Sequence, residues 1–199
     1  EEIDLWLLPT MSISKSNEHT WSSGTLSYTT TTMLSVLDDV ARCVATTSAR
    51  RLVLLNGHGG NTSLLITACR DIRVAHGLLT FLVHPSLPPA SGGTSTVEEL
   101  GMGIHGGLNE TSVFSYLRPG EVQMEKAVRR VPEWMAENDW VKFGGKVQFG
   151  WTSRDFGPEG LIGDPTDANP ELGKELFESA VESLAGQLRE ISNFDFQEN

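Results

Sequence analysis

The fold of this chain is decided by one stretch, RLVLLNGHGGNTS, at residues 51–63. Residues 52–55 form a short apolar run, which is typical of a strand buried on both faces of an α/β sheet. The run stops at Asn56-Gly57, a pair that tolerates positive φ, and residues 61–63 each offer an N-cap for a following helix. The stretch therefore predicts strand, tight glycine loop and helix. It places His58 just past the carboxyl end of a buried strand, where open α/β sheets bind their ligands.

Glycines at positions 57, 59 and 60 surround His58. Because glycine has no Cβ, a ligand and the backbone can approach each other closely there. A lone loop histidine is more often a structural residue bonded to a backbone carbonyl. An ordinary connection would gain nothing from so many glycines, however, so the pattern favours a metal ion or a reacting group beside His58.

Composition limits the classes of partner. The 199 residues suffice for one domain with a sizeable core, and we expect a single domain over 1–199. The formal net charge of -11 argues against nucleic acid or an anionic membrane as a partner. The only cysteines, Cys43 and Cys69, fall within predicted amphipathic helices. Buried free thiols are the expected state, which indicates a reducing compartment such as the cytoplasm.

Apolar periodicity predicts the other elements. Strands are expected at residues 3–8, 52–55 and 78–83, with helices at 30–45 and 62–76 between them. This order is typical of an α/β fold with a parallel sheet. Gly77 is expected to end the second helix. A final helix is expected to begin at Pro170, capped by Asn169.

A second glycine-framed histidine, His105, lies in GMGIHGGLNETS at residues 101–112. Glu110 follows five residues later, near the start of a predicted short helix that begins at Asn109 or Glu110. One interpretation is that Glu110 is there because a carboxylate favours a helix N-terminus. The other is that His105 and Glu110 converge on His58. The recurrence of glycine-framed histidines favours convergence.

Other candidate residues carry weaker signals. Glu18 and His19 are adjacent in a polar loop at residues 12–28, and such a pair suits metal binding or proton transfer. Neighbouring side chains diverge, however, so the pair is weak by itself. Trp151 fits a flat apolar pocket wall and fits ordinary packing equally well. Residues 122–149 are interpreted as a surface excursion or an oligomer contact.

Taken together, the motifs resemble those of the creatininase (creatinine amidohydrolase) family. They occur in the family's order at residues 16–19 with 24–27, 56–61, 105–107 with 110–112, and 160–165. The resemblance implies a three-layer α/β/α fold with a mostly parallel sheet. It also implies a homo-oligomer.

The resemblance further implies a metal-dependent amidohydrolase, which cleaves an amide, cyclic amide or formamide bond of a small molecule with a metal-activated water. Two divalent metals, Zn²⁺, Mn²⁺ or Fe²⁺, are implied. By motif match His58 is a metal ligand, Glu110 is a ligand or its hydrogen-bonding partner, and His105 is the acid–base group. The remaining expected substrate-binding residues are His19, Gly59, Gly60 and Trp151.

The chain departs from the family pattern at two places. Nothing matches the family's E-x-H-G-x-H-L-P segment, which supplies most of the metal ligands, and we expect the chain to lack part of the fold, including the first strand. Gly59-Gly60 stand where creatininase has Tyr-Glu, which argues against creatinine as substrate. A non-catalytic small-molecule-binding or assembly subunit is the alternative function. An anion-binding glycine loop is disfavoured because the loop lacks the Lys-Ser/Thr of a P-loop.

Overall fold

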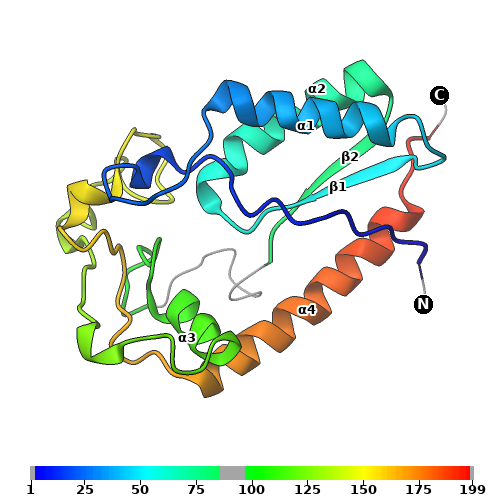
Figure 1. Cartoon of the computed structure of the whole chain (residues 1–199). Helices are drawn as coiled ribbons and strands as arrows, with labels where there is room; N and C mark the ends of the chain where they lie inside the picture. Colours follow the sequence, from blue (N-terminus) through cyan, green and yellow to red (C-terminus); the bar gives the residue numbers. More distant parts are fainter. Residues whose placement is uncertain (1–2, 86–96, 198–199) are drawn as a thin grey trace. The chain divides into compact units, whose positions relative to one another are not determined.

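The computed structural model describes residues 3–85 and 97–197 (Figure 1). The chain divides into two compact units: Glu1–Pro85 with Leu184–Asn199 form the first unit, and Ser86–Ser183 the second. The expectation of a single domain over 1–199 stays a prediction.

The first unit is built on a parallel strand pair. Strands β1 (Arg51–Leu55) and β2 (Leu79–Val83) pair in parallel, with Arg51 opposite Leu79 and Leu55 opposite Val83. Helices α1 (Thr30–Val44) and α2 (Thr62–His76) precede and connect them (Figure 1). The α/β fold class expected from the order of elements is confirmed.

Local sequence sets the helix ends. The Thr29 side chain accepts a hydrogen bond from the Thr32 N–H and so caps α1. Gly77 takes the left-handed conformation, φ 73°, that ends α2, as predicted. The helices bury their apolar faces against the strands in one core. Its buried members are Met33, Leu37, Ala41, Val44, Leu52, Leu64, Leu65, Ala68, Ile72 and Leu78.

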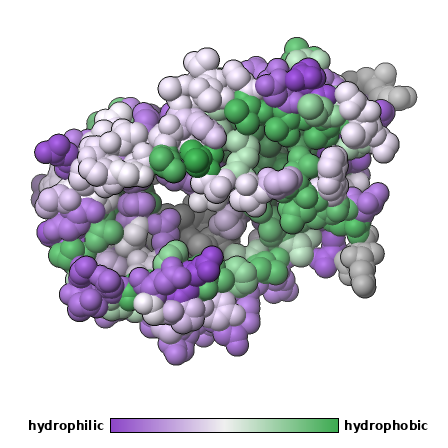
Figure 2. Space-filling view, in the orientation of Figure 1, coloured by the Kyte–Doolittle hydropathy of each residue, from purple (hydrophilic) through white to green (hydrophobic). Residues whose placement is uncertain are grey.

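Two predictions for this unit are wrong. Residues 3–8 form no strand, since within the described chain β1 pairs only with β2. Only Leu8 of this segment packs on the core, while the Leu7 side chain is 83% exposed. Figure 2 shows hydrophobic surface on this unit. Leu5 and Trp6 are also exposed. An apolar run makes a strand only where it finds a pairing edge.

Cys43 is the second correction, because it is exposed rather than buried. The buried face of α1 comprises Met33, Leu37, Ala41 and Val44. Cys43 lies two positions after Ala41, which at 100° per residue turns its side chain away from that face. Cys69 on α2 is partly buried, and both thiols are free.

The second unit has little regular structure besides its helices. Helix α3 (Leu108–Leu117) begins just before the predicted start at Asn109 or Glu110. Helix α4 (Pro170–Asn193) begins in this unit at Pro170, as predicted, and its part from Leu184 onward belongs to the first unit. The Asn169 side chain accepts the Leu172 N–H at 2.9 Å, so it is the expected cap. Short 3-10 turns are η3 (Met124–Lys126), η4 (Glu133–Met135) and η5 (Ser153–Phe156). None of the helices in the described ranges is long and apolar enough to cross a membrane.

Candidate functional site

The glycine loop after β1 is held in place by Asn56. Its backbone N–H donates to the Val83 carbonyl at 2.8 Å, which extends the strand pairing by one residue. Its side-chain oxygen accepts the His58 N–H at 3.2 Å. The His58 carbonyl then accepts the Asn61 N–H at 3.0 Å, within the turn η2 (Gly59–Asn61). Strand, glycine loop and helix follow as predicted, and His58 lies just past the strand end.

A second loop folds against this one and brings a carboxylate. The turn η1 (Asn17–His19) is closed by the Ser16 N–H, which donates to the Ser27 hydroxyl at 2.8 Å. The Asn61 amide donates to the Ser14 hydroxyl at 2.9 Å and so links this loop to the glycine loop. The motifs at residues 16–19, 24–27 and 56–61 are therefore neighbours, and Glu18 is only 8% exposed.

Glu18 points at His58. Its Oε1 lies 2.6 Å from His58 Nε2 and 3.7 Å from His19 Nε2. The two imidazole rings lie 6.1 Å apart, centroid to centroid. His58 Nε2 and Glu18 Oε1 are both buried. An imidazole nitrogen and a carboxylate oxygen are therefore in direct contact away from solvent.

Gly60 leaves the space that the Glu18 carboxylate occupies. A Cβ at position 60 would collide with Glu18 Oε1 and would lie 2.6 Å from His58 Nε2. A Cβ at Gly59 would meet nothing within 4 Å. Of the two glycines assigned to substrate, only Gly60 is enclosed by side chains, and these belong to the chain itself. The substrate-binding roles of Gly59, Gly60 and His19 stay predictions.

The Glu18–His58 pair fits a divalent metal in donor type. One carboxylate oxygen and one imidazole nitrogen, both buried, are the ligands that Zn²⁺, Mn²⁺ and Fe²⁺ accept. Across residues 3–85 and 97–197, no group of three His, Cys, Asp or Glu side chains is arranged to hold a metal. Metal binding by this pair, and the role of His58 as a ligand, stay predictions. Sequence reasoning missed this partnership because it paired Glu18 with its neighbour His19 rather than with the distant His58.

In the second unit His105 is fixed by its backbone. It forms an antiparallel bridge with Ile162: the His105 N–H donates to the Ile162 carbonyl at 3.0 Å, and the Ile162 N–H donates back at 2.9 Å. This joins the motif at residues 105–107 to that at residues 160–165. The pairing of these two motifs was not predicted.

Glu110 turns back toward the same loop. Its Oε2 accepts the Gly106 N–H at 2.7 Å, and the Thr111 hydroxyl donates to the Gly106 carbonyl at 3.1 Å. These contacts support the interpretation that Glu110 is there because a carboxylate favours the N-terminus of helix α3. The metal role of Glu110 and the convergence of His105 and Glu110 on His58 stay predictions.

A buried carboxylate that no motif indicated lies beside glycines 103 and 107 of the loop that carries His105. Glu99 is 1% exposed, and its Oε1 accepts the Asp164 N–H at 2.7 Å and the Leu108 N–H at 3.2 Å. Its sequence context gave no signal. The glycines that enclose it, at 103, 107 and 163, were the available hint.

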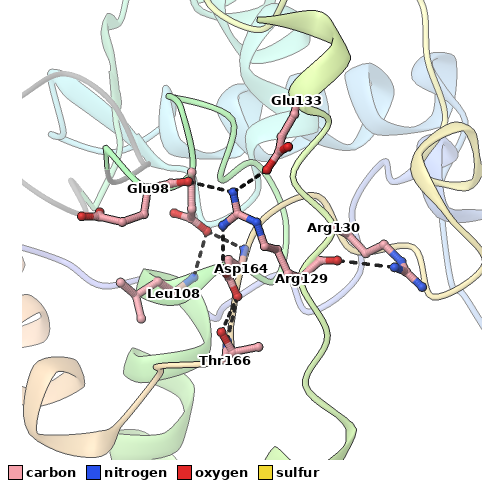
Figure 3. Close-up of polar contacts among 8 residues, drawn as sticks. Glu98, Leu108, Arg129, Arg130, Glu133, Asp164 and Thr166 are labelled. Atoms are coloured by element: carbon pink, nitrogen blue, oxygen red, sulfur yellow. Dashed lines mark hydrogen bonds and ion pairs between the residues drawn. The ribbon is translucent and has the colours of Figure 1, made fainter.

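Arg129 connects the same segments from another direction, as Figure 3 shows. Its guanidinium donates to Asp164 Oδ2 at 2.8 Å, to the Glu98 carbonyl at 3.0 Å and to Glu133 Oε1 at 2.9 Å. Burial acts to raise the pKa of Asp164, but hydrogen bonds from Thr166 and Arg129 outweigh it and hold that pKa below its ordinary value.

Trp151 packs within the second unit. Its ring lies edge-on to Phe143 at 5.3 Å and to Phe156 at 5.9 Å between centroids. The structure therefore shows the packing contacts that the sequence left as one alternative. A contact between Trp151 and substrate stays a prediction.

Comparison with known proteins connects these motifs to a family. The family described as creatinine amidohydrolase matches residues 1–188. A mycofactocin precursor peptide peptidase of Mycobacterium tuberculosis is 30% identical over 186 residues, which cover 89% of this chain and 63% of that protein. A creatinine amidohydrolase of Pseudomonas putida is 28% identical over 179 residues, covering 84% of this chain and 65% of that protein. The chain spans less than two thirds of the length of both relatives.

Solved structures agree on the fold. A putative creatinine amidohydrolase from Bacteroides fragilis superposes with a TM-score of 0.72 at 21% identity, over 96% of this chain and 74% of that one. A creatininase described as a zinc–zinc form and another described as a manganese form give TM-scores of 0.61 and 0.63, at 22% and 23% identity, each over 87% of this chain and 68% of the other. These likenesses establish a creatininase-like α/β fold. With the match over residues 1–188, the chain belongs to the creatininase family.

Proposed function

We propose that this protein hydrolyses a carbon–nitrogen bond of a small amide, with a divalent metal held in part by Glu18 and His58. The observation that carries the proposal is the buried contact of 2.6 Å between Glu18 Oε1 and His58 Nε2. The relatives support it, since their names describe a peptidase and an amidohydrolase. The zinc–zinc and manganese forms of solved creatininases support the choice of metal.

The residues of the chain have distinct tasks in this proposal. Glu18 and His58 supply one oxygen and one nitrogen ligand, and the missing Cβ of Gly60 gives both room. When bound, a divalent metal polarises an amide carbonyl and makes water more acidic. Catalytic zinc generally takes three protein ligands, and Glu110 remains the family-implied candidate beyond the pair. His105 is the group that would move a proton to or from the reacting amide.

The substrate class is an amide, a cyclic amide or a formamide. Gly59-Gly60 stand where creatininase carries Tyr-Glu, which argues against creatinine itself. The peptidase relative adds a peptide bond as a candidate.

A non-catalytic binding or assembly subunit is the second candidate. The observation that favours it is that no three-ligand group is present among the described residues. Tight binding of an amide ligand without turnover would support this alternative.

The test is metal affinity measured by calorimetry with Zn²⁺ and with Mn²⁺. Glu18→Gln and His58→Gln should each weaken binding by about 10- to 100-fold, because each removes a ligand atom. His76→Gln is the matched control, since His76 pairs with Asp38 on the helices instead. Equal affinity in all four proteins would contradict the metal site. Creatinine, an N-formyl amine and a short peptide serve as hydrolysis probes, and absence of turnover with metal bound would favour the binding subunit.

Two further parts of the proposal concern the protein's setting. We infer self-association from the family and a reducing compartment such as the cytoplasm from the free thiols Cys43 and Cys69. Light scattering checks the first, since a mass of a single 21.7 kDa chain would contradict it.

A further inference from the structure

A fully buried carboxylate needs an explanation, and Glu99 is such a group. A charged side chain is almost never fully buried unless it is paired or hydrogen-bonded. One oxygen of Glu99 accepts two backbone N–H groups, from Leu108 and from Asp164. Leu108 is the first residue of α3, where the helix dipole also favours a negative charge.

The chain leaves room for this carboxylate at three glycines. A Cβ at Gly103 or at Gly107 would collide with a carboxylate oxygen of Glu99. A Cβ at Gly163 would lie 2.8 Å from Glu99 Oε1 and 2.7 Å from the Gly107 Cα. The glycines around His105 therefore have a partner inside the protein.

Glu99 is hydrogen-bonded both to the loop that carries His105 and to the segment that is bridged to His105. Glu99 closes the loop that contains His105 by accepting the Leu108 N–H at its far end. It also holds Asp164, two residues after Ile162, to which His105 is bridged. One carboxylate oxygen thus fixes the segment that carries His105 and the segment paired with it.

Arg129 also connects the segment of Glu99 to the segment of Asp164, through other atoms. It bonds to the carbonyl of Glu98, the residue before Glu99, and to the Asp164 carboxylate (Figure 3). Figure 3 also shows the Glu98 side chain directed away from these contacts. The buried anion of Glu99 and the cation of Arg129 therefore hold the same two segments.

We propose that Glu99 is a positioning residue for His105, and that Gly103 and Gly107 are glycines because the Glu99 carboxylate fills their Cβ space. The first part rests on the proposed function, in which His105 moves a proton. Glu99 acts through the backbone of the His105 loop and touches no substrate. The second part holds whatever reaction the protein performs.

The claim that the Glu99 carboxylate fills the Cβ space of these glycines, here called the space claim, is tested by thermal unfolding without any substrate. Gly103→Ala should lower Tm by roughly 5 °C, because the new methyl group displaces the carboxylate. Adding Glu99→Asp shortens the side chain by one methylene, so the double variant should regain part of that loss. Gly150→Ala is the control, since a Cβ there meets nothing within 4 Å. If the double variant loses as much as the sum of the two single variants, the space claim is overturned.

The positioning claim is tested by the ring signals of ¹³C-labelled histidines in solution NMR. Glu99→Ala should move the His105 Cε1–H signal toward its random-coil position, while the His76 signal stays fixed. Glu99→Gln keeps an acceptor oxygen and should restore most of the native position. Glu98→Ala, at an exposed side chain, is the control. An unchanged His105 signal in Glu99→Ala would overturn the claim.

Kinetics separate this inference from the proposed function. On whichever probe amide the wild type hydrolyses, Glu99→Ala should lower kcat by about 100-fold with KM nearly unchanged. In a His105→Gln background Glu99→Ala should have no further effect. Active wild type with unchanged kcat in Glu99→Ala overturns the positioning claim alone. Inactive wild type overturns the proposed function, and the His105 signal still decides the positioning.

Discussion

At the scale of single residues, the adjacent glycines Gly59 and Gly60 differ in what a side chain would meet. Gly59 and Gly60 look alike in the sequence, and both were assigned to substrate. In the structure, a Cβ at Gly60 would occupy the space of the Glu18 carboxylate, while one at Gly59 would meet open space. Gly60 is therefore needed for the contact between Glu18 and His58, whatever other role it has.

This difference predicts the behaviour of a matched pair of variants. Gly60→Ala should weaken Zn²⁺ binding by about 10- to 100-fold, because its methyl group pushes Glu18 away from His58. Gly59→Ala should bind Zn²⁺ as the wild type does. Calorimetric titration measures both, and circular dichroism checks that both are folded. Equal affinities in the two variants would show that Glu18 is not a ligand.

The two cysteines differ in burial, and this difference leads to a second prediction at the residue scale. Burial raises the pKa of the Cys69 thiol, although a hydrogen bond from Thr80 opposes the rise, while Cys43 is exposed on α1. Less thiolate and less access both slow alkylation of Cys69. At pH 7.5 iodoacetamide should modify Cys43 roughly tenfold faster than Cys69. Peptide mass spectrometry of a time course decides this, and faster labelling of Cys69 would be the contrary outcome.

At the scale of elements, helix α4 carries two glycines in opposite situations. Gly173 is buried, and a Cβ there would collide with the Ser112 carbonyl of α3. A Cβ at Gly186 would meet nothing within 4 Å. The first glycine permits close packing of two helices, whereas the second only lowers helix propensity.

The two glycines should therefore respond oppositely to alanine. Gly173→Ala should destabilise the protein by about 2 kcal/mol or more, because a backbone atom must move. Gly186→Ala should stabilise it by about 0.5–1 kcal/mol, because alanine is the better helix former. Urea unfolding of both variants gives the two values. A stable Gly173→Ala protein would mean that α3 and α4 pack less closely than described.

At the scale of the whole molecule, the stability of the fold depends on pH through the carboxyl group of Asp164. Asp164 has a pKa below its ordinary value, since hydrogen bonds from Thr166 and Arg129 outweigh the effect of burial. A carboxyl with a lowered folded-state pKa stabilises the fold above its unfolded pKa, about 3.9. That stability is lost as the pH falls through the folded-state value.

The pH dependence can be assigned to Asp164 by substitution. Asp164→Asn should be less stable than the wild type at pH 6, and the difference should shrink as the pH falls below about 3.9. Asp167→Asn, at an exposed side chain nearby, should leave the pH profile unchanged. Urea unfolding at several pH values measures the differences. A constant difference across the range would contradict the role given to Asp164.

Local signals in the sequence determined much of the fold. The apolar run before His58, the Asn169 cap and Gly77 each act on a few neighbouring residues, and β1, α2 and α4 formed where they indicated. The apolar run at residues 3–8 failed as a strand because pairing depends on a distant edge. Cys43 was misplaced because helical phase decides burial, and the sequence shows that phase only approximately.

The candidate site, like the fold, could be predicted from the sequence only in part. His58 and His105 stand out in the sequence because glycines beside a histidine are visible along the chain. Their carboxylate partners are not visible, since Glu18 lies 40 positions before His58 and Glu99 lies 65 positions before Asp164. Side chains meet through the folding of loops, which no local pattern encodes. The sequence by itself therefore determined the family, the main helices and strands and the two histidines, while only the tertiary structure decided which carboxylate each glycine accommodates.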